Sequence, residues 1–127
     1  MTLQQRLASA LREVLPVREE DDGGLTVQHD GTLASLRVVP VTDELELISL
    51  SQVIAWDLKP DRRIRARVAK HTRSMMLGTV TLVEKKDHAD VMLRYNFPAT
   101  GLSDEALRTL ILMVLTAGAD VHQSLLG

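Results

Sequence analysis

Four histidines and seventeen carboxylates are the side chains with which this 127-residue chain could catalyse a reaction or hold a metal. The chain contains no cysteine, which excludes disulfides, thiolate metal sites and cysteine nucleophiles. No nucleophile elbow, phosphate-binding loop, dinucleotide fingerprint or zinc-protease motif occurs. The histidines lie far apart in the sequence, and no two share a local ligand spacing. We therefore predict no catalytic residue, no metal site and no cofactor. The four are His29, His71, His88 and His122.

The neighbouring acids fall in polar turns. Asp43 with Glu44, and Asp87 with Asp90, have the positions of acids that bond turn backbone and aid solubility. Acid–base catalysis would need two such groups opposed across a pocket. Asp57 ends an apolar run just before a predicted helix, whose first amides lack partners, so we expect it to cap that helix.

Seven of the fifteen basic residues lie in or just before one predicted helix. One interpretation is a solvated face whose cations balance acids elsewhere, such as the 19–22 loop or another subunit. The other is an anion or nucleic-acid surface, with Arg62, Arg63, Arg67 and Lys70 as candidate ligand-binding residues. The net charge of −2 and the absence of interleaved aromatics favour the first, so nucleic acid is not the predicted partner. The seven are Lys59, Arg62, Arg63, Arg65, Arg67, Lys70 and Arg73.

Hydrophobic periodicity predicts one α+β domain over residues 1–127, with the element order α-β-β-β-α-β-β-α. The sheet is expected to be mainly antiparallel, with the helices packed on it. The run 45–58 is too long for one average strand, and we expect a bend within 49–52. The predicted helices cover about 2–15, 60–77 and 103 onward, and the predicted strands cover 25–29, 32–41, 45–58, 79–84 and 89–97.

The last predicted helix carries more apolar surface than one contact can bury. Its core stripe has helical spacing, but Leu112 and Met113 point well away from it and need a second neighbour. The six apolar residues 110–115 fall far short of the roughly 20 needed to cross a bilayer, so we expect no membrane contact and a protein neighbour instead. The stripe consists of Leu107, Ile111, Val114, Gly118, Val121 and Leu125.

Methionine adapts to varied apolar surfaces, which makes it a candidate for partner binding. Met75 lies on the inward stripe of its helix, whereas three other methionines point away from the main apolar faces of their elements. Trp56 alternates with Ile54 and Leu58, which favours a buried place. If the outward methionines cluster with Leu112 or with Trp56, they form an interface. The predicted partner- or dimer-binding residues are Trp56, Met76, Met92, Leu112 and Met113.

Three phrases resemble type III secretion chaperone-like domains, in an actinobacterial branch of that group. They are residues 45–50 with 53–57, residues 78–83, and residues 93–98 with 102–107. The sensory-transduction-regulator-like proteins are a related set with the same fold. The resemblance implies a small, often dimeric, non-enzymatic protein that holds an extended segment of another protein along apolar patches. It implies neither a secretion system nor a catalytic residue.

The expected function is a chaperone-like binding module, homodimeric, for an unknown client protein. The start of the chain lacks the apolar core of a signal peptide, so a cytoplasmic location is expected. The alternative is a regulatory domain that binds an anionic ligand or nucleic acid through the basic helix 59–73. A third hypothesis, an enzyme of an unfamiliar kind, would require a deep polar pocket lined by His71, Asp57 and one more titratable group.

Overall fold

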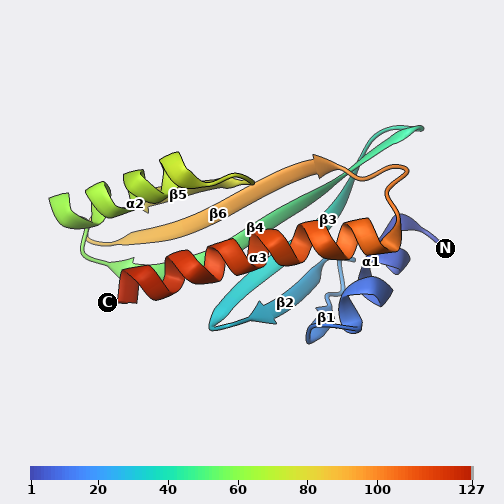
Figure 1. Ribbon diagram of the computed structural model, residues 1–127, viewed down its shortest axis with the longest axis horizontal. Coiled ribbons are helices and arrows are strands. Elements are labelled where there is room, and N and C mark those ends of the chain that lie inside the picture. The colour runs from blue at the N-terminus through green and yellow to red at the C-terminus, as the bar shows by residue number, and fades with distance from the viewer. Residues whose placement is uncertain (127) are drawn as a thin grey trace.

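The computed structural model describes residues 1–126, which form three helices and six strands in one α+β domain (Figure 1). Helix α3 is the longest element, with 23 residues. The elements in chain order are α1 (Leu3–Arg12), β1 (Val17–Glu19), β2 (Leu25–His29), β3 (Thr32–Thr42), β4 (Leu45–Leu58), α2 (Arg62–Ser74), β5 (Thr79–Glu84), β6 (Ala89–Pro98) and α3 (Asp104–Leu126).

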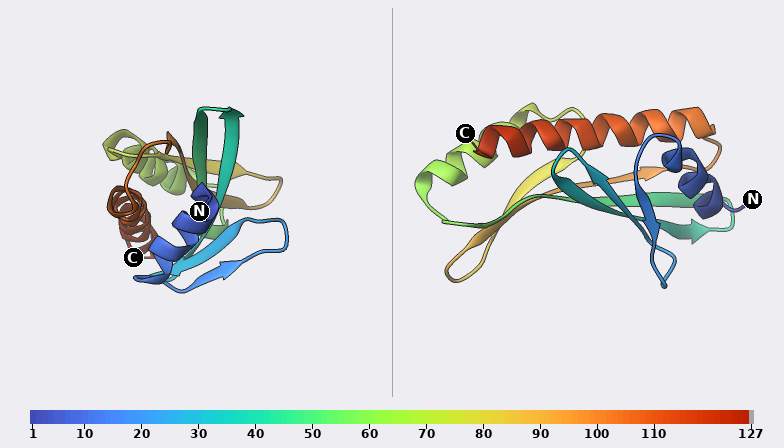
Figure 2. Two further views of the ribbon diagram at one scale, coloured as in Figure 1. Left: turned by 90° about the vertical axis from the view of Figure 1, so that its right-hand side faces the viewer. Right: turned by 90° about the horizontal axis from the view of Figure 1, so that it is seen from below.

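The six strands form one antiparallel sheet in the order β1-β2-β3-β4-β6-β5. All three helices lie on the same face of this sheet, and no layer formed by residues 1–126 covers the opposite face (Figure 2). Helix α3 runs along the middle of the covered face, with α1 near its N-terminal end and α2 near its C-terminal end. The sheet therefore has one covered face and one uncovered face.

Strand alternation decides which side chains enter the core. In β4, Ile48, Leu50 and Ile54 point toward the helices and are fully buried. Ser49, Ser51 and Val53, which alternate with the inward residues, point to the uncovered face and remain partly exposed. Helix α3 completes the core with one side, which consists of Leu107, Ile111, Val114, Leu115, Gly118, Ala119 and Val121.

Gln52 is the polar exception on the covered face, and it is completely buried. Its Nε2 donates to the Thr32 hydroxyl at 2.8 Å and to the Leu115 carbonyl at 3.1 Å. Among residues 1–126, its Oε1 finds no hydrogen-bond partner. A Cβ at Gly118 would lie 1.9 Å from this oxygen, so only glycine lets α3 pass over the amide.

The predicted α+β fold is confirmed, but the predicted element order lacks one strand. Residues 17–19, expected within a loop, form β1 and pair with residues 25–27 of β2. The expected bend within 49–52 is also wrong, because β4 continues through it. The pairing of β4 with β6 becomes irregular later, between Val53 and Leu58.

Helix α2 begins at a different cap from the predicted one. The Asp61 side chain accepts a hydrogen bond from the Ile64 amide at 2.9 Å and is the N-cap. Asp57 is exposed and has a positive φ of 59°, and its own amide donates to the Asp90 carboxylate at 3.0 Å. The prediction that Asp57 caps the helix is therefore wrong, since Asp57 lies within the irregular last part of β4 instead.

Candidate functional site

The strand registers gather apolar side chains on the uncovered face of the sheet. Leu33 of β3 is opposite Val53 of β4, and Val53 is opposite Met92 of β6. Leu33 is 45% exposed, and Val53 and Met92 are partly exposed. These three residues form a continuous apolar row across three adjacent strands.

Trp56 extends this row because β4 contains a bulge. Ile54 and Ala55 are both buried, which breaks the alternation, so Trp56 lies outside the core and is 63% exposed. The sequence prediction that Trp56 is buried is therefore wrong. Trp56 and Leu33 line the same surface hollow, of about 650 Å³, beside the β2–β3 turn. We call Leu33, Val53, Trp56 and Met92 the apolar sheet patch.

A histidine from α3 holds the bulge from the covered side. His122 Nδ1 lies 2.6 Å from the Ile54 carbonyl oxygen, and because a carbonyl only accepts, Nδ1 is the donor. This contact satisfies a backbone group at the irregular part of the ladder. The other ring nitrogen of His122 lies under Gly31, whose positive φ of 82° belongs to the β2–β3 turn. The helix layer thus fixes the position at which Trp56 emerges.

Polar side chains border the apolar sheet patch. Ser35, Ser51 and Arg94 are opposite one another in the next cross-strand row. A second, smaller hollow of about 180 Å³ lies between the two rows. Its lining residues are Thr26, Leu33, Ala34, Ser35, Ser51, Val53 and Met92. An apolar centre with a hydroxyl border suits a polypeptide better than a small charged substrate.

The charged groups of this face are mostly paired at its margins. Arg37 Nη2 lies 2.5 Å from Asp22 Oδ2, and this guanidinium holds the pKa of the Asp22 carboxyl below its usual value. The pKa of Asp90 is also lowered, first by the Asp57 amide and then by Lys85. Arg94, in the middle of the face, is exposed and forms no ion pair within residues 1–126. A partner carboxylate could therefore bind Arg94 without breaking an existing pair.

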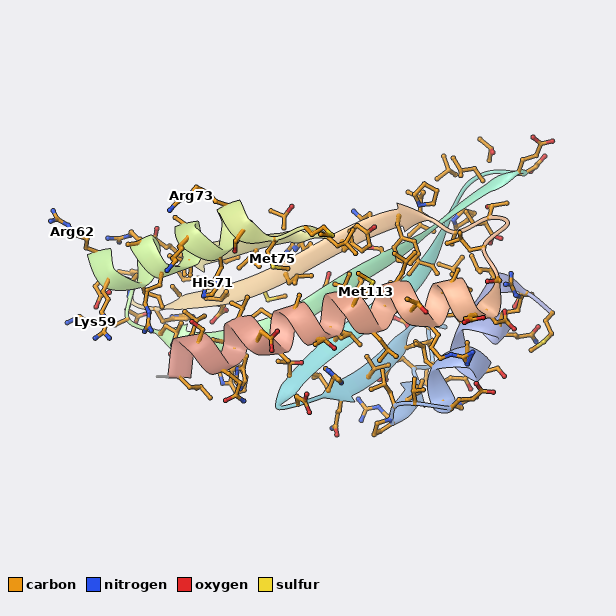
Figure 3. The ribbon with its side chains drawn as sticks, in the orientation of Figure 1. Lys59, Arg62, His71, Arg73, Met75 and Met113 are labelled. Carbon is orange, nitrogen blue, oxygen red and sulfur yellow. The ribbon has the colours of Figure 1, made fainter. Side chains whose placement is uncertain are left out.

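The structure divides the predicted partner-binding residues between two opposite faces. Trp56 and Met92 both adjoin Leu33 on the uncovered sheet face. Leu112 and Met113 lie on the outer side of α3, where Met113 is 48% exposed (Figure 3). Met76 follows α2, is 86% exposed and lines neither group's hollow. The five residues therefore do not form one interface.

Helix α2 presents most of its predicted cations to solvent. Lys59, Arg62 and Arg73 extend away from the body of the molecule, whereas His71 lies on the side toward α3 (Figure 3). Arg65 pairs with Glu84 at 2.7 Å, and Arg67 Nη2 donates to the Ser124 carbonyl at 3.0 Å.

The acids of the 19–22 loop do not balance the cations of α2. Glu19, Glu20 and Asp22 pair with Arg12, Arg18 and Arg37 respectively. The hypothesis that this loop neutralises α2 is therefore wrong. Within residues 1–126, Arg62, Arg63 and Lys70 form no ion pair, so three of the four candidate anion-binding residues keep uncompensated charge.

The titratable residues of the described chain do not form a recognisable reaction centre. Residues 1–126 contain no group of three His, Cys, Asp or Glu side chains that could hold a metal ion. His71 bonds the Ser124 hydroxyl at 3.1 Å, and His88 bonds its neighbour Asp87 at 2.9 Å. Asp57 lies beyond the bulge of β4 and bonds Asp90 through its amide, so it does not join His71 in a shared pocket.

Helix α3 has the length and composition of a helix that could cross a membrane. Length and composition are weak evidence, because the core helix of a soluble protein meets the same criterion. One side of α3 is buried against the sheet of its own domain, as expected for such a core helix.

Sequence reasoning missed Leu33 and Val53 as candidate residues. Both belong to ordinary alternating strands, and such residues are exposed only when no layer covers their face. The alternation itself carries no signal for the placement of all three helices on one face.

Comparison with known proteins finds no matching family model and no matching curated protein. Among solved structures, the chain is similar to the crystal structure of YbjN from E. coli, described as "a putative transcription regulator". The similarity has a TM-score of 0.63 at 14% sequence identity and covers 93% of this chain and 87% of YbjN. At this level of identity the similarity shows the fold, a single α+β domain.

Proposed function

We propose that this chain is a non-enzymatic, chaperone-like protein-binding module, homodimeric and cytoplasmic. It holds a segment of a client protein on the uncovered face of its sheet. The observation that carries the proposal is the apolar sheet patch, in which Leu33 and Trp56 are 45% and 63% exposed on a face without a covering layer. An exposed apolar group bordered by polar residues is typical of an interaction surface.

Burial of this patch supplies the affinity of the proposed complex. Removing apolar surface from water contributes about 25 cal/mol per Å², and tryptophan is the side chain most enriched at interface hot spots. Met92 adds an unbranched side chain that adapts to different client residues. Ser35 and Ser51 then offer hydrogen bonds at the edge of the contact. A segment with apolar residues at its centre and polar residues on both sides fits this arrangement.

Strand addition is a second contact available to an extended client. Strand β5 is an edge strand of six residues, and only β6 pairs with it. Its outer backbone groups could pair with an added strand, while alternate side chains of that strand reach the uncovered face. This geometry matches the extended client segment that the chaperone-like resemblance implies.

Photo-crosslinking tests the client site. A photoreactive residue replaces Leu33 in the protein produced in its native cells, and the products are resolved by mass. We expect one discrete adduct that is lost when Met92→Glu is added, because a charge then lies within the buried contact. The matched control places the same photoreactive residue at Met76, which is apolar and 86% exposed but lies outside the patch. No adduct at Leu33, or an adduct that persists with Met92→Glu, would contradict the proposal.

A regulatory function through α2 is the second candidate. Arg62, Arg63 and Lys70 have no acidic partner within residues 1–126, and unpaired cations on one helix attract polyanions. Fluorescence anisotropy with a duplex oligonucleotide at increasing salt tests this candidate. Binding that weakens with salt and is lost on Arg62→Glu with Arg63→Glu would favour it. Equal, weak binding by wild type and variant would exclude it.

A further inference from the structure

Charge is distributed unevenly along the molecule. Residues 57–90, which include α2 and β5, contain nine Lys and Arg against five Asp and Glu, a net charge of +4. The rest of the chain contains six Lys and Arg against twelve acids, a net charge of −6. Helix α2 lies near the C-terminal end of α3, and α1 and the β3–β4 hairpin lie near its N-terminal end (Figure 1). The molecule is therefore cationic at one end and acidic at the other.

The outer side of α3 lies between these two ends. Its middle carries a shallow depression of about 500 Å³ around Met113, and Met113 is 48% exposed. Most residues around Met113 are small, which lets a second helix approach to the 8–10 Å typical of packed helices. The lining residues are Thr109, Leu112, Met113, Thr116, Ala117 and Asp120.

The acidic flank of this surface lies at the first turn of α3. Glu105 is exposed and forms no ion pair within residues 1–126. Asp104 beside it pairs with Arg6 at 2.8 Å, and Glu13 of the segment after α1 pairs with Arg108. Of the two acids in the first turn of α3, Glu105 is therefore the one that is available to a partner.

The basic flank lies at the other end of α3, where α2 packs beside it. Both Arg67 and His71 bond Ser124 of α3, which fixes the two helices together. Arg63 and Lys70 are exposed and form no ion pair within residues 1–126. At 100° per residue both project from the solvent side of α2, 40–60° from the direction of Arg67. Both are therefore available to an acid of a second copy.

We propose that a second copy of this chain docks on the outer side of α3, with the two α3 helices antiparallel around a two-fold axis close to Met113 and Thr116. Glu105 of one copy then meets Arg63 and Lys70 of the other copy. A two-fold axis repeats this contact, so each dimer contains it twice. The inference rests on the homodimer of the proposed function and specifies its surface and orientation.

Charge complementarity is the reason for choosing a second copy as the occupant. A middle built around Met113, with acid at one end and base at the other, is complementary to itself when one copy is reversed. A parallel arrangement would instead place acid on acid and base on base. A helix of 23 residues is about 35 Å long. With α1 and α2 beside it, this layer can supply the roughly 800 Å² per partner that a stable interface needs. The apolar sheet patch, on the opposite face, stays free for a client.

A charge-reversal exchange tests this arrangement. One variant carries Glu105→Lys, and a second carries Arg63→Glu with Lys70→Glu. Each variant alone places like charges at both repeated contacts, so sedimentation equilibrium should show a dimer dissociation constant at least tenfold higher than that of wild type. Mixing the two variants restores attraction at both contacts, so the mixture should form a heterodimer of near wild-type affinity. Circular dichroism establishes that both variants are folded.

Two further variants test whether the dimer forms through α3 or through the uncovered face of the sheet. Met113→Glu should weaken the dimer at least tenfold, whereas Met92→Glu on the uncovered sheet face should leave it unchanged. A wild type that stays monomeric at 100 micromolar, a mixture without heterodimer, or dissociation by Met92→Glu alone would overturn the inference. Failure of the dimer is distinguishable from failure of the client site, because a monomer that still gives the Leu33 adduct retains the proposed binding function. A dimer that gives no Leu33 adduct would support the proposed arrangement of the α3 helices and contradict the proposed client site.

Discussion

The two faces of this sheet are built from the same strands but differ in how deeply their side chains are buried. On β3, Leu36 points to the helices and is fully buried, whereas Leu33 points to the other side and is 45% exposed. The residue type is the same, and the difference comes only from the layer that covers one side. A chain of ordinary globular composition can therefore expose an apolar surface on one face of its sheet when all of its helices pack on the other face.

Polar groups differ between the two faces in the same way. Under the helices, Gln52 is enclosed and bonds Thr32 and Leu115, with one oxygen left unpaired. On the uncovered face, Ser35, Ser51 and Arg94 retain access to water and to a partner. The Gln52 amide on the covered face bonds only within the fold, whereas the polar side chains on the uncovered face remain available to a partner.

We expect the largest difference in the free energy of unfolding when leucine is replaced by alanine on each face of β3 in turn. Leu36→Ala leaves a cavity in the core and should lower the free energy of unfolding by about 2–5 kcal/mol. Leu33→Ala removes a side chain that water already contacts and should lower it by less than about 1 kcal/mol. Urea denaturation of both variants measures the pair. Equal losses would show that the uncovered face is buried in solution.

Gly118 of α3 packs against the Gln52 amide and offers a second test of the covered face. Alanine normally stabilises a helix relative to glycine by about 1 kcal/mol, but at Gly118 its Cβ would meet the Gln52 amide. We expect Gly118→Ala to destabilise the protein by about 1–3 kcal/mol, because the enclosed amide must move. Adding Gln52→Ala should recover part of the loss through coupling of the two sites. A stabilising Gly118→Ala would contradict this packing.

His122 connects the two faces, since it bonds the Ile54 carbonyl at the bulge that exposes Trp56. His122→Ala removes one hydrogen bond and should cost about 1 kcal/mol of unfolding free energy. It should also shift the emission maximum of Trp56, the only tryptophan in the chain. His88→Ala, a histidine in the β5–β6 turn, is the matched control and should leave the Trp56 emission unchanged. An unchanged Trp56 signal in His122→Ala would show that the bulge does not depend on this contact.

The smallest expected effect lies at the border of the covered face, where Arg65 of α2 pairs with Glu84 of β5. Hydrogen bonds from Arg65 hold the pKa of Glu84 below its ordinary value of 4.5. A carboxyl with a lowered pKa in the folded state contributes fully above pH 4.5 and loses its contribution as the pH falls through the folded value. Stability measured from pH 6 to pH 3 should therefore fall less steeply in Glu84→Gln than in wild type.

The control for this titration is Glu44→Gln, at the exposed β3–β4 turn. Glu44 forms no ion pair within residues 1–126, so its variant should keep the wild-type slope. A Glu84→Gln slope equal to that of Glu44→Gln would show that the pair with Arg65 does not attach α2 to β5.

The sequence predicted the local patterns of this fold and missed what depends on distant contacts. Alternation placed strands 25–29, 79–84 and 89–97 almost as observed, because each pattern is local. Trp56 was misplaced because its direction depends on a bulge set by pairing with β6 and by His122, which lies 66 positions later in the chain.

The candidate site was predictable only in part for the same reason. Met92 and Met113 were recognised as outward-facing residues from their own elements, and both are partly or largely exposed. Leu33 and Val53 could not be recognised, because their exposure requires knowing that α1, α2 and α3 all lie on the opposite face. Where an element is regular, local spacing thus predicts the direction of a side chain but not whether another layer covers it.

The most direct test of the account observes Trp56 while a client is bound. Protein labelled with 5-fluorotryptophan contains one fluorine site, so an unlabelled client identified by crosslinking adds no fluorine signal. The account predicts one resonance at the shift of a solvated tryptophan in the free protein, and a shifted or broadened resonance when the client is added. A complex that forms with the Trp56 resonance unchanged would contradict the claim that the uncovered face of the sheet holds the client.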